Sequence, residues 1–221
     1  MEIKNAETNT SPLEFERFVF ISNDYRELIK DRRYENLVFR LISKSTVVFD
    51  RLTFTKIETQ SNGECDFKDN NNTKYDAKLL IDSKQGALIG EKKNSILLWV
   101  EDTIKEINEF PQRLQVTQDY SFISNTRLYR IMKERIATVE EDENVIFFSP
   151  FPLVADSQQN YLNSFCTDYL DAVYDCMAEE GLIGNRRMYF IYQSLEQGIF
   201  VLRDDHAMRE YISMPELDSL I

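Results

Sequence analysis

The sequence predicts an α/β fold in which helices flank a mixed central sheet. Apolar residues recur at helical spacing in a segment that runs from residue 24 to about residue 44. Three strand-like runs separated by polar turns follow between residues 47 and 81. Farther along, residues 145–151 form a continuous apolar run, which is typical of a strand buried on both faces. This run indicates that one sheet spans both halves of the chain.

The first helix is predicted to end near Lys44. Ser22, Asn23 and Asp24 offer side chains that can cap its N-terminus. Residues at helical spacing form one apolar stripe: Tyr34, Leu37, Val38, Leu41 and Ile42. Glu35 lies at the edge of this stripe, where spacing alone leaves open whether its carboxylate faces water or serves a site.

The next three elements are predicted to be strands. Residues 47–60 are rich in β-branched and aromatic side chains and indicate a long first strand. A turn at 61–63 leads to a second strand at 64–67, and a turn at 69–72 leads to a third strand at 73–81. Turns this short place consecutive strands side by side in one sheet.

The remaining chain is predicted to add helices and a hairpin. Helices are expected at 95–110, 126–139 and 157–180, strands at 188–192 and 199–202, and acidic segments at 140–143 and at the C-terminus. We predict a flexible N-terminus over residues 1–12 and a single domain over 13–221. Its core would occupy 24–153, with a C-terminal addition at 154–221.

Composition argues against several classes of protein. The chain has 221 residues, is 43% hydrophobic and carries a net charge of -12. Neither a signal-peptide pattern nor a membrane-spanning apolar run is visible, so we expect a cytoplasmic protein with no membrane partner. Three cysteines without CxxC spacing disfavour a disulfide framework and a zinc knuckle. The single histidine, His206, leaves little basis for Ser-His-Asp hydrolysis and is expected on the surface.

The clearest chemistry lies between residues 66 and 78. Side chains alternate along a strand, so Asp76 and Lys78 share one face of the third strand. Asp66 can bring a second carboxylate from the preceding strand, and Ala77 can offer its backbone carbonyl. Such oxygens suit Mg²⁺ or Mn²⁺. With Lys78 orienting water and balancing phosphate charge, the arrangement predicts phosphodiester hydrolysis.

This pattern resembles the PD-(D/E)XK superfamily of restriction-endonuclease-like nucleases. Cys65-Asp66-Phe67 stands at the PD position, with cysteine in place of the usual proline, and Asp76-Ala77-Lys78 stands at the (D/E)XK position. The resemblance implies an αβββαβ core and a Mg²⁺-dependent endodeoxyribonuclease acting on DNA in restriction, repair or defence. It also implies supporting catalytic roles for Gln85 and Glu35. Glu35 lies in the segment YENLVFRLI, which resembles the first helix of many of these nucleases.

Two readings of the motif residues compete with this assignment. Asp76 followed by Glu91-Lys92-Lys93 also fits the spacing of the motif. Alternatively, Asp76 and Lys78 form a solvent-facing ion pair on an edge strand that binds no metal. Glu58 is a further candidate acid. Lys92 and Lys93 precede the helix at 95–110 and are expected to hold a substrate phosphate.

The net charge raises a second candidate function. Affinity for nucleic acid comes largely from basic groups, so a charge of -12 requires either concentrated basic patches or a partner that supplies them. Local basic clusters occur at 26–33, 127–135 and 186–187. A protein partner or a homo-oligomer is therefore expected. The alternative to a nuclease is a non-catalytic subunit that keeps the fold and acts as an interaction module.

Overall fold

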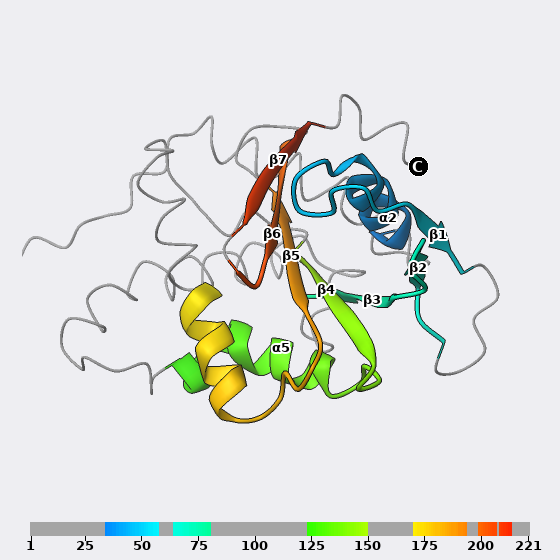
Figure 1. Ribbon diagram of the computed structural model, residues 1–221. Coiled ribbons are helices and arrows are strands. Elements are labelled where there is room, and N and C mark those ends of the chain that lie inside the picture. Colours follow the sequence, from blue (N-terminus) through cyan, green and yellow to red (C-terminus); the bar gives the residue numbers. More distant parts are fainter. Residues whose placement is uncertain are drawn as a thin grey trace, which may run out of the picture.

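The computed structural model describes residues 34–57, 64–80, 123–149, 170–193, 199–206 and 208–213. Within these ranges the chain forms a mixed α/β fold built on a seven-stranded sheet (Figure 1). No helix in this part of the chain is long and apolar enough to cross a membrane.

The seven strands lie in the sheet in their order along the chain. Their bounds are β1 Phe54–Lys56, β2 Phe67–Asp69, β3 Lys74–Leu79, β4 Glu143–Ser149, β5 Met188–Gln193, β6 Ile199–Asp204 and β7 Arg209–Ser213. Strand β4 pairs in parallel with β3 and β5, and all other neighbours are antiparallel. Parallel neighbours need long crossover connections. Helix α5 (Arg127–Ile136) lies in the connection before β4, and a helix at 170–179 lies in the one after it.

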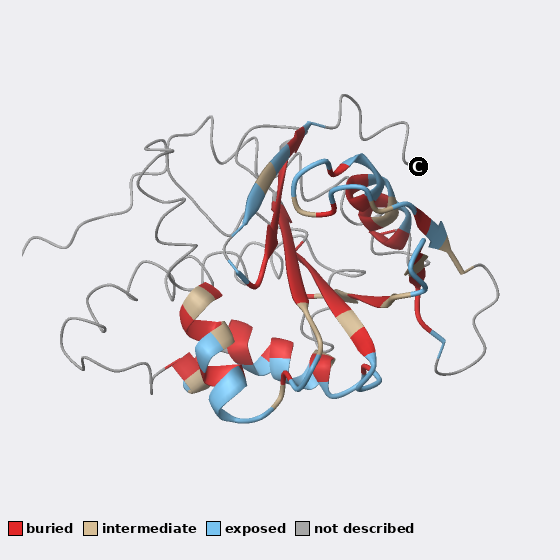
Figure 2. Ribbon diagram, viewed as in Figure 1, coloured by how far each residue is buried: buried red, intermediate tan, exposed pale blue. Residues whose placement is uncertain are grey.

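Helices cover both faces of the sheet, which gives three layers (Figure 1). Helix α2 (Tyr34–Lys44) packs on one face, and α5 and the helix at 170–179 pack on the other. Alternate residues of β4 serve the two cores: Ile146 and Phe148 face α2, whereas Val145 and Phe147 face α5. Strand β4 is buried from residue 145 to residue 149 (Figure 2), as the apolar run that begins at 145 predicts.

Several local predictions are confirmed. Every residue of the predicted apolar stripe of α2 is buried, and the helix ends at Lys44. The helix predicted at 126–139 forms as α5 over 127–136, and the Thr126 hydroxyl caps it by accepting a hydrogen bond from the Tyr129 N–H. Gly181 follows the helix at 170–179 with a φ of 71°, a left-handed conformation that suits glycine. The hairpin of β5 and β6 forms at the predicted place.

The predicted long first strand is wrong in extent, since β1 contains three residues. The segment before it leaves the sheet because a carboxylate on β7 binds its backbone. Glu210 accepts hydrogen bonds from the N–H groups of Thr46, Val47 and Val48 at 2.8, 3.1 and 3.3 Å. Arg51 adopts a φ of 62°, which is incompatible with a strand. Residues 58–60, including the candidate acid Glu58, lie outside the described residues.

The second strand and the end of the chain also differ from prediction. Strand β2 covers 67–69 instead of 64–67, because Asp69 closes the turn after it. The Asp69 carboxylate accepts hydrogen bonds from the N–H groups of Asn71 and Thr73 at 2.8 and 2.9 Å. Glu143 begins β4 instead of ending an acidic turn. Strand β7 forms where only an acidic tail is predicted, since its short charged sequence shows no strand pattern.

Candidate functional site

The site is built around an irregularity at the start of β2. Phe67 pairs with Tyr75 in the β2–β3 ladder, yet the Asp66 N–H also donates to the Tyr75 carbonyl at 3.0 Å. Two consecutive residues therefore oppose one residue of β3, which is the arrangement of a β-bulge. Bulges interrupt strand pairing and redirect side chains, so this one sets where the Asp66 carboxyl points.

The Asp66 carboxyl serves as the hydrogen-bond partner of a backbone N–H group on β3. Its Oδ2 accepts a hydrogen bond from the Ala77 N–H at 2.7 Å. The backbone groups of Ala77 point toward β2 because those of Tyr75, two residues earlier, do so. The Ala77 carbonyl thus lies on the same side of β3 as the Asp66 carboxyl.

Asp76 and Lys78 project together from the opposite face of β3 to the one that carries Tyr75 and Ala77. The neighbouring apolar residues establish this, since Tyr75 and Ala77 belong to the core under α2 while Leu80 belongs to the core under α5. The Lys78 Nζ lies 2.6 Å from the Asp76 Oδ2, and only 16% and 11% of the two side chains are exposed. Strand β3 lies between β2 and β4. The expectation of a solvent-facing pair on an edge strand is therefore wrong.

The side chain of Asp66 influences the ionisation of the Asp76 carboxyl. The pKa of Asp76 is raised to about 7. Burial is the largest cause of this rise, and a hydrogen bond with the Asp66 side chain is the second. The Lys78 ammonium opposes this rise without cancelling it. The structure thus places two carboxyls together that are costly to ionise at once, a situation that a cation relieves.

Helix α2 contacts β3 through its first turn, from the face of the sheet opposite Asp76 and Lys78. The Tyr34 hydroxyl donates a hydrogen bond to the Ala77 carbonyl at 3.5 Å. Glu35, the next residue along the chain, is buried. Within the described ranges, however, no three His, Cys, Asp or Glu residues are grouped so that they could hold a metal ion. Glu35 therefore does not complete a three-carboxylate cluster with Asp66 and Asp76 in this structure.

No protein-family model, curated protein or solved structure matches this chain. Four other residues with expected roles, Gln85, Glu91, Lys92 and Lys93, lie outside the described residues.

Some charged residues that sequence reasoning treats as candidates serve the fold instead. Arg187, from the basic pair at 186–187, donates to Asp205 at 2.7 Å and to Asp204 at 3.1 Å. His206 is exposed, as predicted. Cys65 and Cys176 are buried.

Glu143 is a buried acid near the site that sequence reasoning misses. It is 2% exposed and pairs in register with Lys74, on the same face of the sheet as Asp76. Its pKa is raised, chiefly by burial, although Lys74 lies 3.9 Å away and opposes the rise. No sequence signal could reveal this neighbour, because the parallel pairing of β3 with β4 joins segments almost seventy residues apart.

Proposed function

We propose that this protein is a metal-dependent nuclease that hydrolyses phosphodiester bonds, with DNA as the expected substrate. The observation that carries the proposal is the meeting of Asp66, Asp76 and Lys78 at the opened edge of the β2–β3 ladder. These are the three residues that the PD-(D/E)XK resemblance marks. A buried group of two carboxyls and a lysine contributes little to stability. Stability alone therefore does not explain why these three side chains lie together.

The order of the elements also supports the proposal. Among the described elements, helix α2, the antiparallel strands β1, β2 and β3, helix α5 and strand β4, which is parallel to β3, occur in this order along the chain. This order is compatible with the αβββαβ core that the resemblance implies. Strands β5, β6 and β7 extend the same sheet beyond β4.

The donor set fits a hard divalent cation. The carboxyls of Asp66 and Asp76 and the Ala77 carbonyl provide oxygens, which Mg²⁺ and Mn²⁺ prefer. When bound, the cation would supply Lewis-acid activation of water and offset charge on the phosphate. The low solvent exposure around Asp76 strengthens every electrostatic contact there.

Lys78 would act on the substrate side of this pair. Its ammonium carries three donors on a flexible stem, so it can hold an attacking water toward the phosphorus and stabilise the charge that grows on the phosphate oxygens. In the metal-free chain, the 2.6 Å contact with Asp76 keeps the ammonium beside the carboxyl pair. The bulge at Asp66 fixes the other carboxyl relative to both groups.

A non-catalytic interaction module is the second candidate. Large apolar side chains are exposed around β7, an edge strand of the described sheet: Val47, Met208 and Tyr211. Val47 lies at this edge because its N–H donates to Glu210 on β7. Exposed apolar residues on a sheet edge suit a protein partner. The net charge of -12 is equally compatible with this role.

Cleavage of a substrate panel tests the proposal. Plasmid DNA, linear duplex DNA, single-stranded DNA and RNA would each be incubated with Mg²⁺, with Mn²⁺ or with a chelator. We expect metal-dependent cleavage by the native chain and a loss of roughly a hundredfold or more in Asp76→Ala and Lys78→Ala. Lys74→Ala is the matched control, since its ammonium sits on the same strand but pairs with Asp142 at 2.8 Å.

The outcomes separate the two candidates. Loss of cleavage in both site variants, with circular dichroism unchanged and Lys74→Ala active, supports the nuclease and identifies its substrate class. Cleavage that survives both substitutions, or none by the native chain on any substrate, rejects it. The interaction module would then be tested at the β7 edge, by Tyr211→Ser in a measurement of oligomeric state.

A further inference from the structure

We propose that the Lys78 ammonium is the resident counter-ion of the Asp66–Asp76 pair, and that a divalent cation binds there by displacing it. The inference rests on the proposed function, because it concerns the same site. It adds a regulatory property: metal binding and the release of Lys78 are one coupled event.

The contacts around Asp76 carry this inference. One of its oxygens, Oδ2, lies 2.6 Å from the Lys78 Nζ, and its side chain also bonds to that of Asp66. Asp66 in turn has its own Oδ2 committed to the Ala77 N–H at 2.7 Å. Each carboxyl therefore has one oxygen engaged by a donor of this chain. The ammonium holds the position from which a cation would reach Asp76.

Geometry makes the two cations exclusive at that oxygen. Mg²⁺ binds oxygen at roughly 2.0–2.1 Å and tolerates little distortion of its ligand shell. An ammonium 2.6 Å from the Asp76 Oδ2 occupies the same space and carries a like charge. The lysine stem has four flexible carbons, so the head can move aside without moving β3. The moved ammonium is then free to contact water or phosphate.

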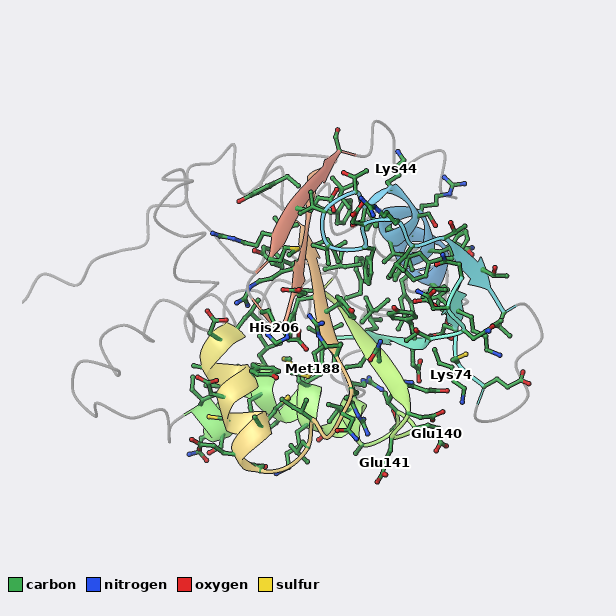
Figure 3. All side chains as sticks on the ribbon, in the orientation of Figure 1. Lys44, Lys74, Glu140, Glu141, Met188 and His206 are labelled. Atoms are coloured by element: carbon green, nitrogen blue, oxygen red, sulfur yellow. The ribbon has the colours of Figure 1, made fainter. Side chains whose placement is uncertain are left out.

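The strand itself supplies a comparison for the effect of Lys78. Lys74 projects from the same face of β3 and carries the same charge, yet its ammonium is held by Asp142 at 2.8 Å. It lies with Glu140 and Glu141 at the end of the sheet where β3 and β4 begin (Figure 3). Removing Lys74 thus changes the total charge as much as removing Lys78, without touching the carboxyl pair.

Calorimetric titration with Mn²⁺, repeated with Mg²⁺, tests the inference on the full chain. The proteins are the native chain, Lys78→Met, which keeps an unbranched stem without the charge, and Lys74→Met. We expect Lys78→Met to bind Mn²⁺ more tightly by on the order of tenfold or more, as expected when a contacting cation is removed. Lys74→Met should stay within about twofold of the native chain, as exposed charges do.

A spectroscopic measurement separates displacement from general repulsion. In the native chain with labelled lysine, the Nζ resonance absent from Lys78→Met is assigned to Lys78. We expect this resonance to shift on addition of diamagnetic Mg²⁺, with the same midpoint as the calorimetric titration. The Lys74 resonance should not move. A Lys78 signal that ignores Mg²⁺ while the metal binds would overturn displacement.

The outcomes also distinguish this inference from the proposed function. Tighter Mn²⁺ binding by Lys78→Met, with no cleavage by the native chain on any substrate, keeps the inference and removes the nuclease. Equal or weaker binding by Lys78→Met, with cleavage intact, removes the inference and keeps the nuclease. Binding by Lys78→Met alone supports complete occupancy by the ammonium. Binding by none of the three proteins overturns both.

Discussion

Replacing Asp76 with asparagine is expected to stabilise the metal-free chain at neutral and alkaline pH while abolishing the proposed activity. Burial and then the Asp66 side chain raise the pKa of Asp76 to about 7, against an ordinary value of 3.8. In the unfolded chain this carboxyl ionises near the ordinary value. Between these two values the native state binds more protons than the unfolded state, so stability falls as the pH rises through this window.

The magnitude follows from the two pKa values. Their difference of about 3 corresponds to about 4 kcal/mol in the free energy of unfolding, lost between about pH 4 and pH 7 and constant above it. Asparagine resembles the protonated carboxyl in shape and carries no charge. The variant should therefore match the native chain near pH 4 and exceed its stability by up to about 4 kcal/mol above pH 7.

Urea denaturation in the presence of a chelator, at a series of pH values, measures this difference directly. Asp142→Asn is the matched control, because the hydrogen bond from Lys74 lowers the pKa of the exposed Asp142 carboxyl. Its effect on stability should be small and opposite in sign. A difference between Asp76→Asn and the native chain that stays constant with pH, or that favours the native chain under alkaline conditions, would refute the reasoning.

Two further predictions concern the frame around the site. Partial burial alone would raise the pKa of Glu210, but hydrogen bonds from Ser45 and from the N–H groups of residues 46–48 lower it. Glu210→Gln should lower the free energy of unfolding by roughly 1–3 kcal/mol, as measured by urea denaturation. This loss should be present above the ordinary carboxyl pKa and should disappear as the pH falls below it. Equal stability of the variant and the native chain would show that residues 46–48 do not need the charge. Burial raises the pKa of the Cys65 and Cys176 thiols, so both should resist a thiol reagent until urea unfolds the chain. Each single variant, Cys65→Ser or Cys176→Ser, keeps one of these two thiols and the third cysteine, Cys166. Rapid labelling of two thiols in each variant would contradict the burial of Cys65 and Cys176.

Local elements with strong periodicity could be predicted from the sequence. The apolar stripe of α2 and the continuous apolar run of β4 each identify an element and its buried face without reference to the rest of the chain. The hairpin of β5 and β6 is equally local. In these segments the same side chains that favour the local conformation also build the core.

Elements decided by distant partners could not be predicted in this way. Residues 47–53 have strand-forming composition, yet the carboxylate of Glu210, more than 160 residues away, binds the backbone at their start. Strand β7 has a charged sequence and becomes a strand because β6 offers it a paired edge. Local strand propensity does not decide the conformation where a tertiary hydrogen bond satisfies the backbone groups better.

The candidate site divides along the same line. The shared face of Asp76 and Lys78 follows from their spacing in the sequence, because side chains alternate along a strand. The approach of Asp66 to Asp76 depends instead on the bulge in β2, and the buried position of Glu143 beside them depends on the pairing of β3 with β4. Side-chain facing is a local property of the backbone, whereas contact between strands depends on pairing and register, which the whole sheet sets.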